Sequence, residues 1–163
     1  MTVQDIIAML ASSEKSVATA ESCTGGLIAS TIVDVPGASD CFNEGYITYS
    51  NEAKMKNLGV NSETLRLYGA VSKQTACEMA NGVRKAANAD YGISSTGIAG
   101  PGGGTAEKPV GLVYIACAYG ADECIYRELH LTGDRGQVRR AAAAEAINLL
   151  AEVLETSNNR GIK

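Results

Sequence analysis

The sequence has little of what several large protein classes require. It holds one histidine, no Cys-X-X-Cys pair, no run of lysine and arginine, and no apolar stretch near the roughly 20 residues of a membrane span. With 14 basic and 18 acidic residues, the formal net charge is −4 and the sequence pI is about 5.0. Because nucleic-acid affinity rests largely on Lys and Arg that neutralise phosphates, we expect neither a nucleic-acid partner nor a membrane partner.

The cysteines are five in number, Cys23, Cys41, Cys77, Cys117 and Cys124. An odd number without a Cys-X-X-Cys pair indicates neither a disulfide framework nor a thiolate zinc site. The N-terminal residues also lack the basic segment of a secretory signal. We therefore expect reduced thiols in a cytoplasmic protein that holds no metal.

Apolar residues at helical spacing alternate with runs of β-branched and aromatic residues, which predicts an α/β domain with a mixed sheet. A length of 163 residues without a repeat or linker fits a single domain, 1–163, whose polar tail 156–163 we expect to fray. The expected helices are 2–12, 27–35, 51–58, 72–87 and one starting at Asp134 with a capping box to Gln137, and the expected strands are 16–20, 46–49, 91–95, 111–118 and 124–131.

Three turns rich in small residues follow expected strands, at 21–26, 36–40 and 97–104. Ligands of open α/β sheets bind beyond the carboxyl ends of strands, where such turns gather. Residues 24–26 precede a helix and could bind an anion at its N-terminus, or their glycines could serve only a tight turn. The glycine spacing of 97–104 is not that of a nucleoside-triphosphate P-loop, which leaves a ligand-covering loop or a plain surface loop.

Catalytic bases are few in this sequence. Any Ser–His or Cys–His pair must use His130, which lies in an expected strand and fits a structural histidine better. Lysine or tyrosine then remains as the base, and a lysine works near neutral pH only if burial or nearby cations lower its pKa. Tyr49 ends an expected strand and Lys54 lies in the first turn of the next helix, so both could reach one pocket, although Lys54 could equally be a solvated helix residue.

Five segments resemble the CinA C-terminal domain family, in the family's order and over nearly the whole chain: 20–26 (AESCTGG), 49–54 (YSNEAK), 69–72 (GAVS), 97–101 (GIAGP) and 108–111 (KPVG). The resemblance implies an α/β/α domain, often a homo-oligomer, without the molybdopterin-binding-like N-terminal domain of longer members. It implies a nicotinamide mononucleotide (NMN) deamidase of bacterial pyridine-nucleotide salvage. This reaction hydrolyses the carboxamide of NMN to nicotinic acid mononucleotide and ammonia, and we expect no cofactor.

The resemblance also implies site residues. It places the catalytic serine at Ser39 and the tyrosine and lysine of the site at Tyr49 and Lys54. Lys54 would hold the serine proton for the departing ammonia, and Tyr49 would relay the proton or orient the lysine. For the phosphate, Arg135 is expected, with Arg139 as the alternative, because a guanidinium fork suits phosphate oxygens. The expected substrate contacts are Thr96, Arg135, Glu21, Thr24, Gly25 and Gly97, where Glu21 could meet the ribose hydroxyls or only structure its turn.

Two other readings stay open. A Cys23 thiolate could attack the amide, with Glu21 and Lys54 as acid–base partners, because a helix N-terminus lowers the pKa of a thiol. Cys23 could also be a small buried thiol that packs the turn. Alternatively, the domain could be a pyridine-nucleotide-binding module without turnover, which NMN would stabilise without releasing ammonia.

Overall fold

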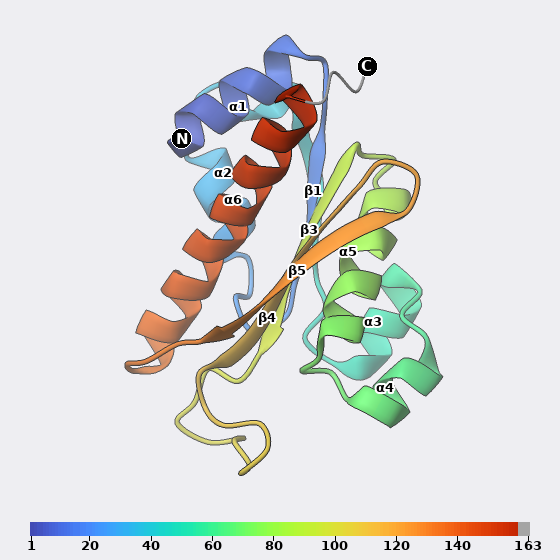
Figure 1. The fold of residues 1–163 in the computed structure, drawn as a ribbon, viewed down its shortest axis with the longest axis vertical. Coiled ribbons are helices and arrows are strands. Elements are labelled where there is room, and N and C mark those ends of the chain that lie inside the picture. The colour runs from blue at the N-terminus through green and yellow to red at the C-terminus, as the bar shows by residue number, and fades with distance from the viewer. Residues whose placement is uncertain (160–163) are drawn as a thin grey trace.

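A five-stranded sheet lies between two layers of helices in the computed structural model, which describes residues 1–159 (Figure 1). The elements are α1 (Val3–Ser12), β1 (Val17–Glu21), α2 (Leu27–Val33), η1 (Ala38–Asp40), β2 (Phe42–Ile47), α3 (Asn51–Leu58), α4 (Ser62–Tyr68), α5 (Lys73–Ala86), β3 (Tyr91–Gly97), β4 (Leu112–Tyr119), β5 (Glu123–His130) and α6 (Arg135–Asn159). The strand order is β2-β1-β3-β4-β5. Strands β1, β2 and β3 are parallel, and β4 and β5 are antiparallel to their neighbours. The predicted α/β class with a mixed sheet is confirmed.

The two faces of the sheet bury different side chains. Helices α1, α2 and α6 cover one face over large aliphatic residues such as Leu10, Ile28 and Leu150. Helix α5 covers the other face, where alanines of α5 pack against alanines of β4. A Cβ on Gly92 of β3 would lie 2.1 Å from the carbonyl oxygen of Ala80 on α5. The small side chains therefore let α5 lie directly against β3.

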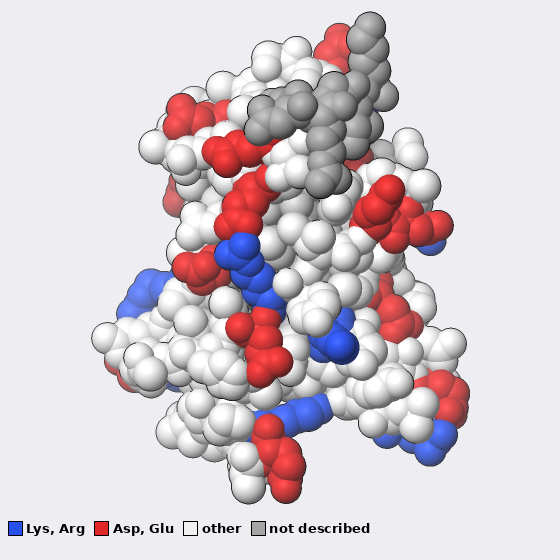
Figure 2. Space-filling view, viewed as in Figure 1, with Lys and Arg blue, Asp and Glu red and all other residues white. Residues whose placement is uncertain are grey.

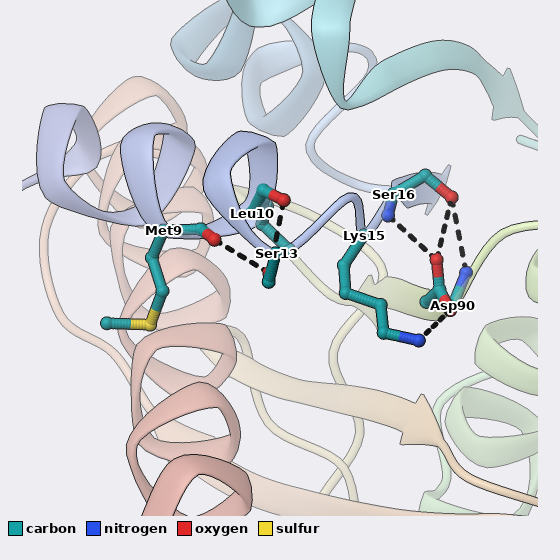
Figure 3. A network of polar contacts seen from close by, with 6 residues as sticks. All are labelled: Met9, Leu10, Ser13, Lys15, Ser16 and Asp90. Atoms are coloured by element: carbon teal, nitrogen blue, oxygen red, sulfur yellow. Dashed lines mark hydrogen bonds and ion pairs between the residues drawn. The ribbon is translucent and has the colours of Figure 1, made fainter. Parts of the chain in front are cut away.

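Polar contacts join the segment before β1 to the start of β3 (Figure 3). The backbone N–H of Ser16 donates to Asp90 Oδ2 at 2.9 Å, and Lys15 Nζ lies 3.0 Å from Asp90 Oδ1. Next to them, the backbone N–H of Tyr91 donates to the carbonyl of Ser16 at 2.9 Å. These bonds fix the register of β1 on β3, in which Glu21 at the end of β1 pairs with Ser95, so the carboxyl ends of the two strands lie at the same edge of the sheet.

Most expected elements differ from the observed ones by one or two residues, and three differences are larger. Strand β2 covers Phe42–Ile47 instead of 46–49, and α4 was not predicted at all. Helix α6 continues to Asn159, so residues 156–159 of the expected frayed tail are helical, while 160–163 lie outside the described residues. The capping box at the start of α6 is confirmed, because Asp134 Oδ1 accepts from the N–H of Gln137 and the Gln137 side chain accepts from the N–H of Asp134.

On the face shown in Figure 2, lysines and arginines lie apart from one another among acidic side chains. This face therefore carries no basic patch among the described residues. None of the helices within residues 1–159 is long and apolar enough to cross a membrane.

Candidate active site

The candidate active site is a cavity of about 260 Å³ at the carboxyl ends of β1 and β3. Ser22, which follows β1, and Thr96 and Gly97, which end β3, line one part of it. Tyr49 and Lys54, from the segment after β2 and from α3, line another part, and Arg135 reaches it from the start of α6. The crevice outside the carboxyl ends of strands is where open α/β sheets bind ligands.

Lys54 is buried in the floor of this cavity. Ser50 caps α3 by accepting from the N–H of Ala53, which places Lys54 in the first turn of the helix, and its side chain reaches the residues that follow β1 and β2. Lys54 is 1% exposed, and its Nζ lies 2.9 Å from Ser22 Oγ and 2.8 Å from the carbonyl oxygen of Thr48. Burial lowers the pKa of Lys54 below its usual value, so the amine loses its proton more easily than a solvated lysine does.

Arg135 and Tyr49 meet at the mouth of the cavity. Arg135 Nη2 donates to Tyr49 Oη at 2.9 Å, and Arg135 Nη1 donates to the carbonyl of Gly100 at 2.8 Å. The Tyr49 side chain is 64% exposed, whereas Lys54 lies at the bottom. The guanidinium therefore ties the segment after β2 to the glycine-rich loop after β3, and it is one of the two cationic groups in the cavity lining.

The turn between β1 and α2 is organised by a buried carboxylate. Glu21 is 1% exposed, and its Oε1 accepts from Thr24 Oγ1 at 2.6 Å and from the N–H of Ile28 at 2.9 Å. Its Oε2 accepts from the N–H of Ala29 at 3.0 Å. The expected anion at this helix start is thus the chain's own Glu21, because that carboxylate already takes the N–H groups that a phosphate would need.

Glu21, Thr24 and Gly25, which we predicted as substrate contacts, lie in this turn and not in the lining of the cavity. Thr24 is fully buried, its Oγ1 lying 2.6 Å from Ser95 Oγ, and neither it nor Glu21 lines the cavity. Gly25 and the following Gly26 have φ of +58° and +103°, a left-handed backbone that glycine adopts without strain. The tight-turn interpretation of these glycines is the one that the geometry supports.

Arg135 and Arg139 take different positions. Arg139 Nε donates to the carbonyl of Cys23 at 3.0 Å, and its Nη2 donates to the carbonyl of Thr24 at 2.9 Å. It therefore holds the β1–α2 turn from outside the cavity, whereas Arg135 lines the cavity itself.

Thr96, another predicted substrate contact, does line the cavity. Its Oγ1 donates to the carbonyl of Ala70, a second lining residue, at 2.8 Å.

Gly97 lies in the cavity lining, and this position requires a glycine for a steric reason. A Cβ at this position would meet Val113 Cγ2 at 2.6 Å and the carbonyl oxygen of Leu112 at 2.7 Å. The strand end thus needs a residue without a side chain to pair closely with β4. Gly97 presents backbone rather than a side chain to a ligand in the cavity.

The expected serine, Ser39, is not brought to Lys54. It lies exposed in η1, outside the lining of the cavity, and its side chain is not within hydrogen-bonding distance of Lys54 or Tyr49. Ser22 takes that place, 2.9 Å from Lys54 Nζ and 7% exposed. The sequence offered a signal for Ser22, because it lies in a small-residue turn after an expected strand. The residues of that turn that we expected to bind or react were instead Glu21, Cys23, Thr24 and Gly25.

The other candidate nucleophile and base are less well placed. Cys23 lines the cavity, but burial raises the pKa of its thiol to about 11, which keeps it protonated near neutral pH. His130 lies on β5 with Nε2 2.8 Å from Glu128 Oε1, outside the cavity lining. Within residues 1–159, no group of three or more His, Cys, Asp and Glu residues could hold a metal ion.

The CinA C-terminal domain model matches residues 2–154. The chain belongs to this family. A relative of the CinA domain in Acetivibrio thermocellus is 56% identical over 142 residues, which are 87% of this chain and 34% of the relative. The "CinA-like protein" of Kosmotoga olearia is 52% identical over 149 residues, 91% of this chain and 36% of the relative. The CinA domain described here thus spans about a third of the length of these curated relatives.

Solved structures match the CinA domain over nearly its whole length. The competence/damage inducible protein CihA from Agrobacterium tumefaciens is 39% identical with a TM-score of 0.86, and the match covers 94% of this chain and 95% of that one. A CinA superfamily protein from Klebsiella pneumoniae is 32% identical with a TM-score of 0.90, covering 94% and 96% of the two chains. Both the fold and the family are therefore established.

Proposed function

We propose that this CinA domain hydrolyses the carboxamide of NMN, with Ser22 as the nucleophile and Lys54 as its base. The observation that carries the proposal is the 2.9 Å contact between Lys54 Nζ and Ser22 Oγ at the bottom of the cavity. A serine hydroxyl attacks an amide only when a base removes its proton, and a buried lysine with a lowered pKa can be that base. The family resemblance of the sequence supplies the substrate.

The first half of the reaction forms an ester. Neutral Lys54 takes the proton of Ser22 as Oγ bonds to the carboxamide carbon, and the carbonyl oxygen of the substrate takes up the negative charge. As the carbonyl re-forms, the C–N bond breaks and Lys54 returns the proton to the nitrogen, which leaves as ammonia. The carbonyl of Thr48, 2.8 Å from Lys54 Nζ, keeps the amine directed at Ser22 throughout.

The second half of the reaction consumes water. Neutral Lys54 takes a proton from a water molecule, whose oxygen attacks the ester carbon. Cleavage of the ester then lets Lys54 return its proton to Ser22 Oγ. The carboxylic acid of nicotinic acid mononucleotide releases its remaining proton to solvent and leaves as the carboxylate. One lysine thus serves as base and acid in both halves, in the way that histidine does in better-known hydrolases.

The cavity also suits the rest of the nucleotide. The two basic residues that line it are Lys54 and Arg135, and no carboxylate lies among its lining residues. Arg135 can exchange its bond to Tyr49 for phosphate oxygens, because its planar fork binds them in pairs. Before the phosphate binds, Tyr49 accepts a hydrogen bond from Arg135, and we assign it this orienting role rather than a proton relay. The free thiols of the five cysteines support action in the reducing cytoplasm.

The test is ammonia release from NMN by the purified protein after treatment with a chelator. Ser22→Ala should lower turnover by about 1,000-fold or more, because a nucleophile that acts in a unit with its base cannot be partly replaced. Ser39→Ala is the matched control, since it removes the same hydroxyl from an exposed turn outside the cavity, and it should retain wild-type turnover.

Other results would favour the remaining interpretations. Full activity of Ser22→Ala with inactivity of Ser39→Ala would contradict the role of Ser22 and favour Ser39. Loss of turnover in Cys23→Ala with an unchanged melting temperature would favour the thiol mechanism. A wild type that NMN stabilises without releasing ammonia would be a nucleotide-binding module.

A further inference from the structure

Two cysteines face each other between α5 and β5, away from the candidate active site. Cys77 and Cys124 are 47 residues apart in sequence, and their sulfur atoms lie 2.9 Å apart. Both side chains are partly exposed, and neither lines the cavity that holds Ser22. A disulfide has an S–S distance of about 2.05 Å, so the two sulfurs need to approach by only about 0.9 Å to bond.

The other three cysteines are placed differently. Cys23, Cys41 and Cys117 are each 5% exposed or less. Cys117 packs in the core beneath α6, whereas β5 presents Cys124 to α5 on the opposite face of the sheet. The pair of Cys77 and Cys124 is therefore the one that combines close approach with access from solvent.

Regular secondary structure holds the pair in place. Cys77 lies one helical turn after Lys73, so both side chains lie on the same face of α5. Cys124 lies two residues before Tyr126, so both side chains lie on the same face of β5. Lys73 Nζ lies 5.5 Å from the centre of the Tyr126 ring, a second contact between these faces. Since neither cysteine is on a loose loop, the two sulfurs stay opposite each other in the folded protein.

The two thiols are not equivalent. The Cys124 S–H donates to Cys77 Sγ, and this hydrogen bond lowers the pKa of Cys77. The same bond, together with burial, raises the pKa of Cys124. Cys77 is therefore the thiol that ionises first and attacks an oxidant, because the thiolate is the reactive form.

We propose that Cys77 and Cys124 form a reversible disulfide with each other. The oxidant is a low-molecular-weight disulfide such as oxidised glutathione. The Cys77 thiolate attacks one sulfur of oxidised glutathione, which breaks its S–S bond and releases one glutathione thiolate. Cys124 then loses its proton to solvent and attacks Cys77 Sγ of the mixed disulfide, which releases the second glutathione. Two protein thiols are oxidised and one glutathione disulfide is reduced to two thiols. The inference does not depend on the proposed deamidase activity.

The bridge should be reversible because its sulfurs remain accessible. Disulfides that solvent reaches are the labile ones, whereas those of stable frameworks resist reduction by glutathione. When the bridge is closed, it joins α5 to the edge strand β5 across a loop of 47 residues. This loop restricts the unfolded chain and should therefore stabilise the folded one.

The experiment incubates the reduced full chain with oxidised glutathione, blocks remaining thiols with iodoacetamide and digests with a protease that cleaves after glutamate. This digestion separates Cys117 from Cys124 and yields the fragments 64–78 and 124–128, which hold Cys77 and Cys124. We expect the two fragments joined, with the mass of their sum less two hydrogens, and their separation by dithiothreitol. The oxidised protein should melt about 10 °C above the reduced protein.

Matched variants separate this pair from a general effect of oxidation. Cys77→Ser should abolish both the joined fragments and the rise in melting temperature, whereas Cys41→Ser, which removes a buried thiol, should keep both. Recovery of fragments 64–78 and 124–128 only as separate, alkylated or glutathione-bearing peptides from the wild type would overturn the proposal. An equal rise in the melting temperature of Cys77→Ser would overturn it as well.

Discussion

Lys54 shows how one residue couples the chemistry of the site to the stability of the chain. It is 1% exposed, and its hydrogen bonds go to a hydroxyl and a carbonyl oxygen, with no ion pair to a described carboxylate. Transfer of an ammonium group into such a place is costly, so the amine gives up its proton more easily than a solvated lysine does. Both consequences can be measured.

The first consequence concerns the pH dependence of the deamidase reaction. Because neutral Lys54 is the active form, kcat/KM should rise with pH and level off with a midpoint below 10.5, the usual lysine pKa. Ammonia release measured from about pH 6 to about pH 10 checks this. A rate that falls with rising pH through the neutral range would contradict Lys54 as the base.

The second consequence concerns stability and needs no substrate. In the window between the lowered folded pKa of Lys54 and 10.5, the unfolded chain binds more protons than the folded one, so wild-type stability rises with pH. Lys54→Met removes this slope. The free energy of unfolding of the variant minus that of the wild type should be largest below the folded pKa and shrink toward pH 10.5.

Urea unfolding at several pH values measures this difference. The hydrogen bonds lost at Ser22 and Thr48 do not titrate in this range, so they shift the difference equally at every pH. Lys56→Met, an exposed lysine on the same helix, is the matched control and should show no such trend. A constant difference for Lys54→Met would show that Lys54 is charged in the folded protein.

Part of the site could be predicted from the types and spacing of its residues. The rest depends on contacts between segments that are distant in the sequence. Lys54, Tyr49 and Arg135 were expected, and the structure places all three in the cavity lining. Ser22 was not, because its role depends on the side chain of a helix 32 residues further along the chain. Spacing within one segment cannot show which of several serines a lysine reaches.

At the scale of elements, α2 depends on a residue outside its own range. It has seven residues and a left-handed glycine at its N-cap without a capping side chain. Glu21, at the end of β1, accepts instead from the N–H groups of Gly26, Ile28 and Ala29. The last residue of the strand therefore stabilises the beginning of the helix that carries the chain away from the site.

Glu21→Gln tests this arrangement. The amide keeps one oxygen but turns an NH2 group toward N–H donors, so one or more of these donors loses its acceptor while buried. We expect a loss of about 2 kcal/mol in the free energy of unfolding, measured by urea titration. Glu155→Gln on the exposed side of α6 should change it little. Equal effects of the two substitutions would contradict the role of Glu21.

Elements without a buried apolar face escaped prediction. Helix α4 has no buried residue, so no stripe of apolar side chains marked it. Strand β2 lies at the edge of the sheet, and three of its six residues, Asn43, Glu44 and Gly45, are poor strand formers. By contrast, α5 and β3, which are buried at the centre, were predicted within a few residues.

At the scale of the whole molecule, the fold class could be predicted because the alternation of helix and strand patterns already specifies α/β. The order of the strands could not, because β1 pairs with β2 about 25 residues further along the chain and also with β3 more than 70 residues further along. The bonds of Ser16 to Asp90 are among these contacts. A sequence pattern shows which side chains are apolar, but it does not show which strands pair with each other.

The assembly state of the whole molecule remains a prediction, namely a homo-oligomer. Strand β2 leaves one edge of the sheet open, and the Ile47 side chain at its end is 60% exposed. Size-exclusion chromatography with light scattering should give a mass above the monomer's 16.9 kDa. Ile47→Lys should reduce that mass if this edge forms the contact, and Leu67→Lys, on the exposed side of α4, should not.

The two ends of the described chain, Met1 beside α1 and the last turn of α6, lie at one end of the molecule, while the glycine-rich loop that borders the cavity lies at the other (Figure 1). This polarity makes the domain convenient for attachment to a solid support. A biotin or an affinity tag linked before Val3 would hold the protein to a sensor surface by the end remote from Ser22. Binding of nucleotides could then be followed on the immobilised protein with the cavity facing the flow.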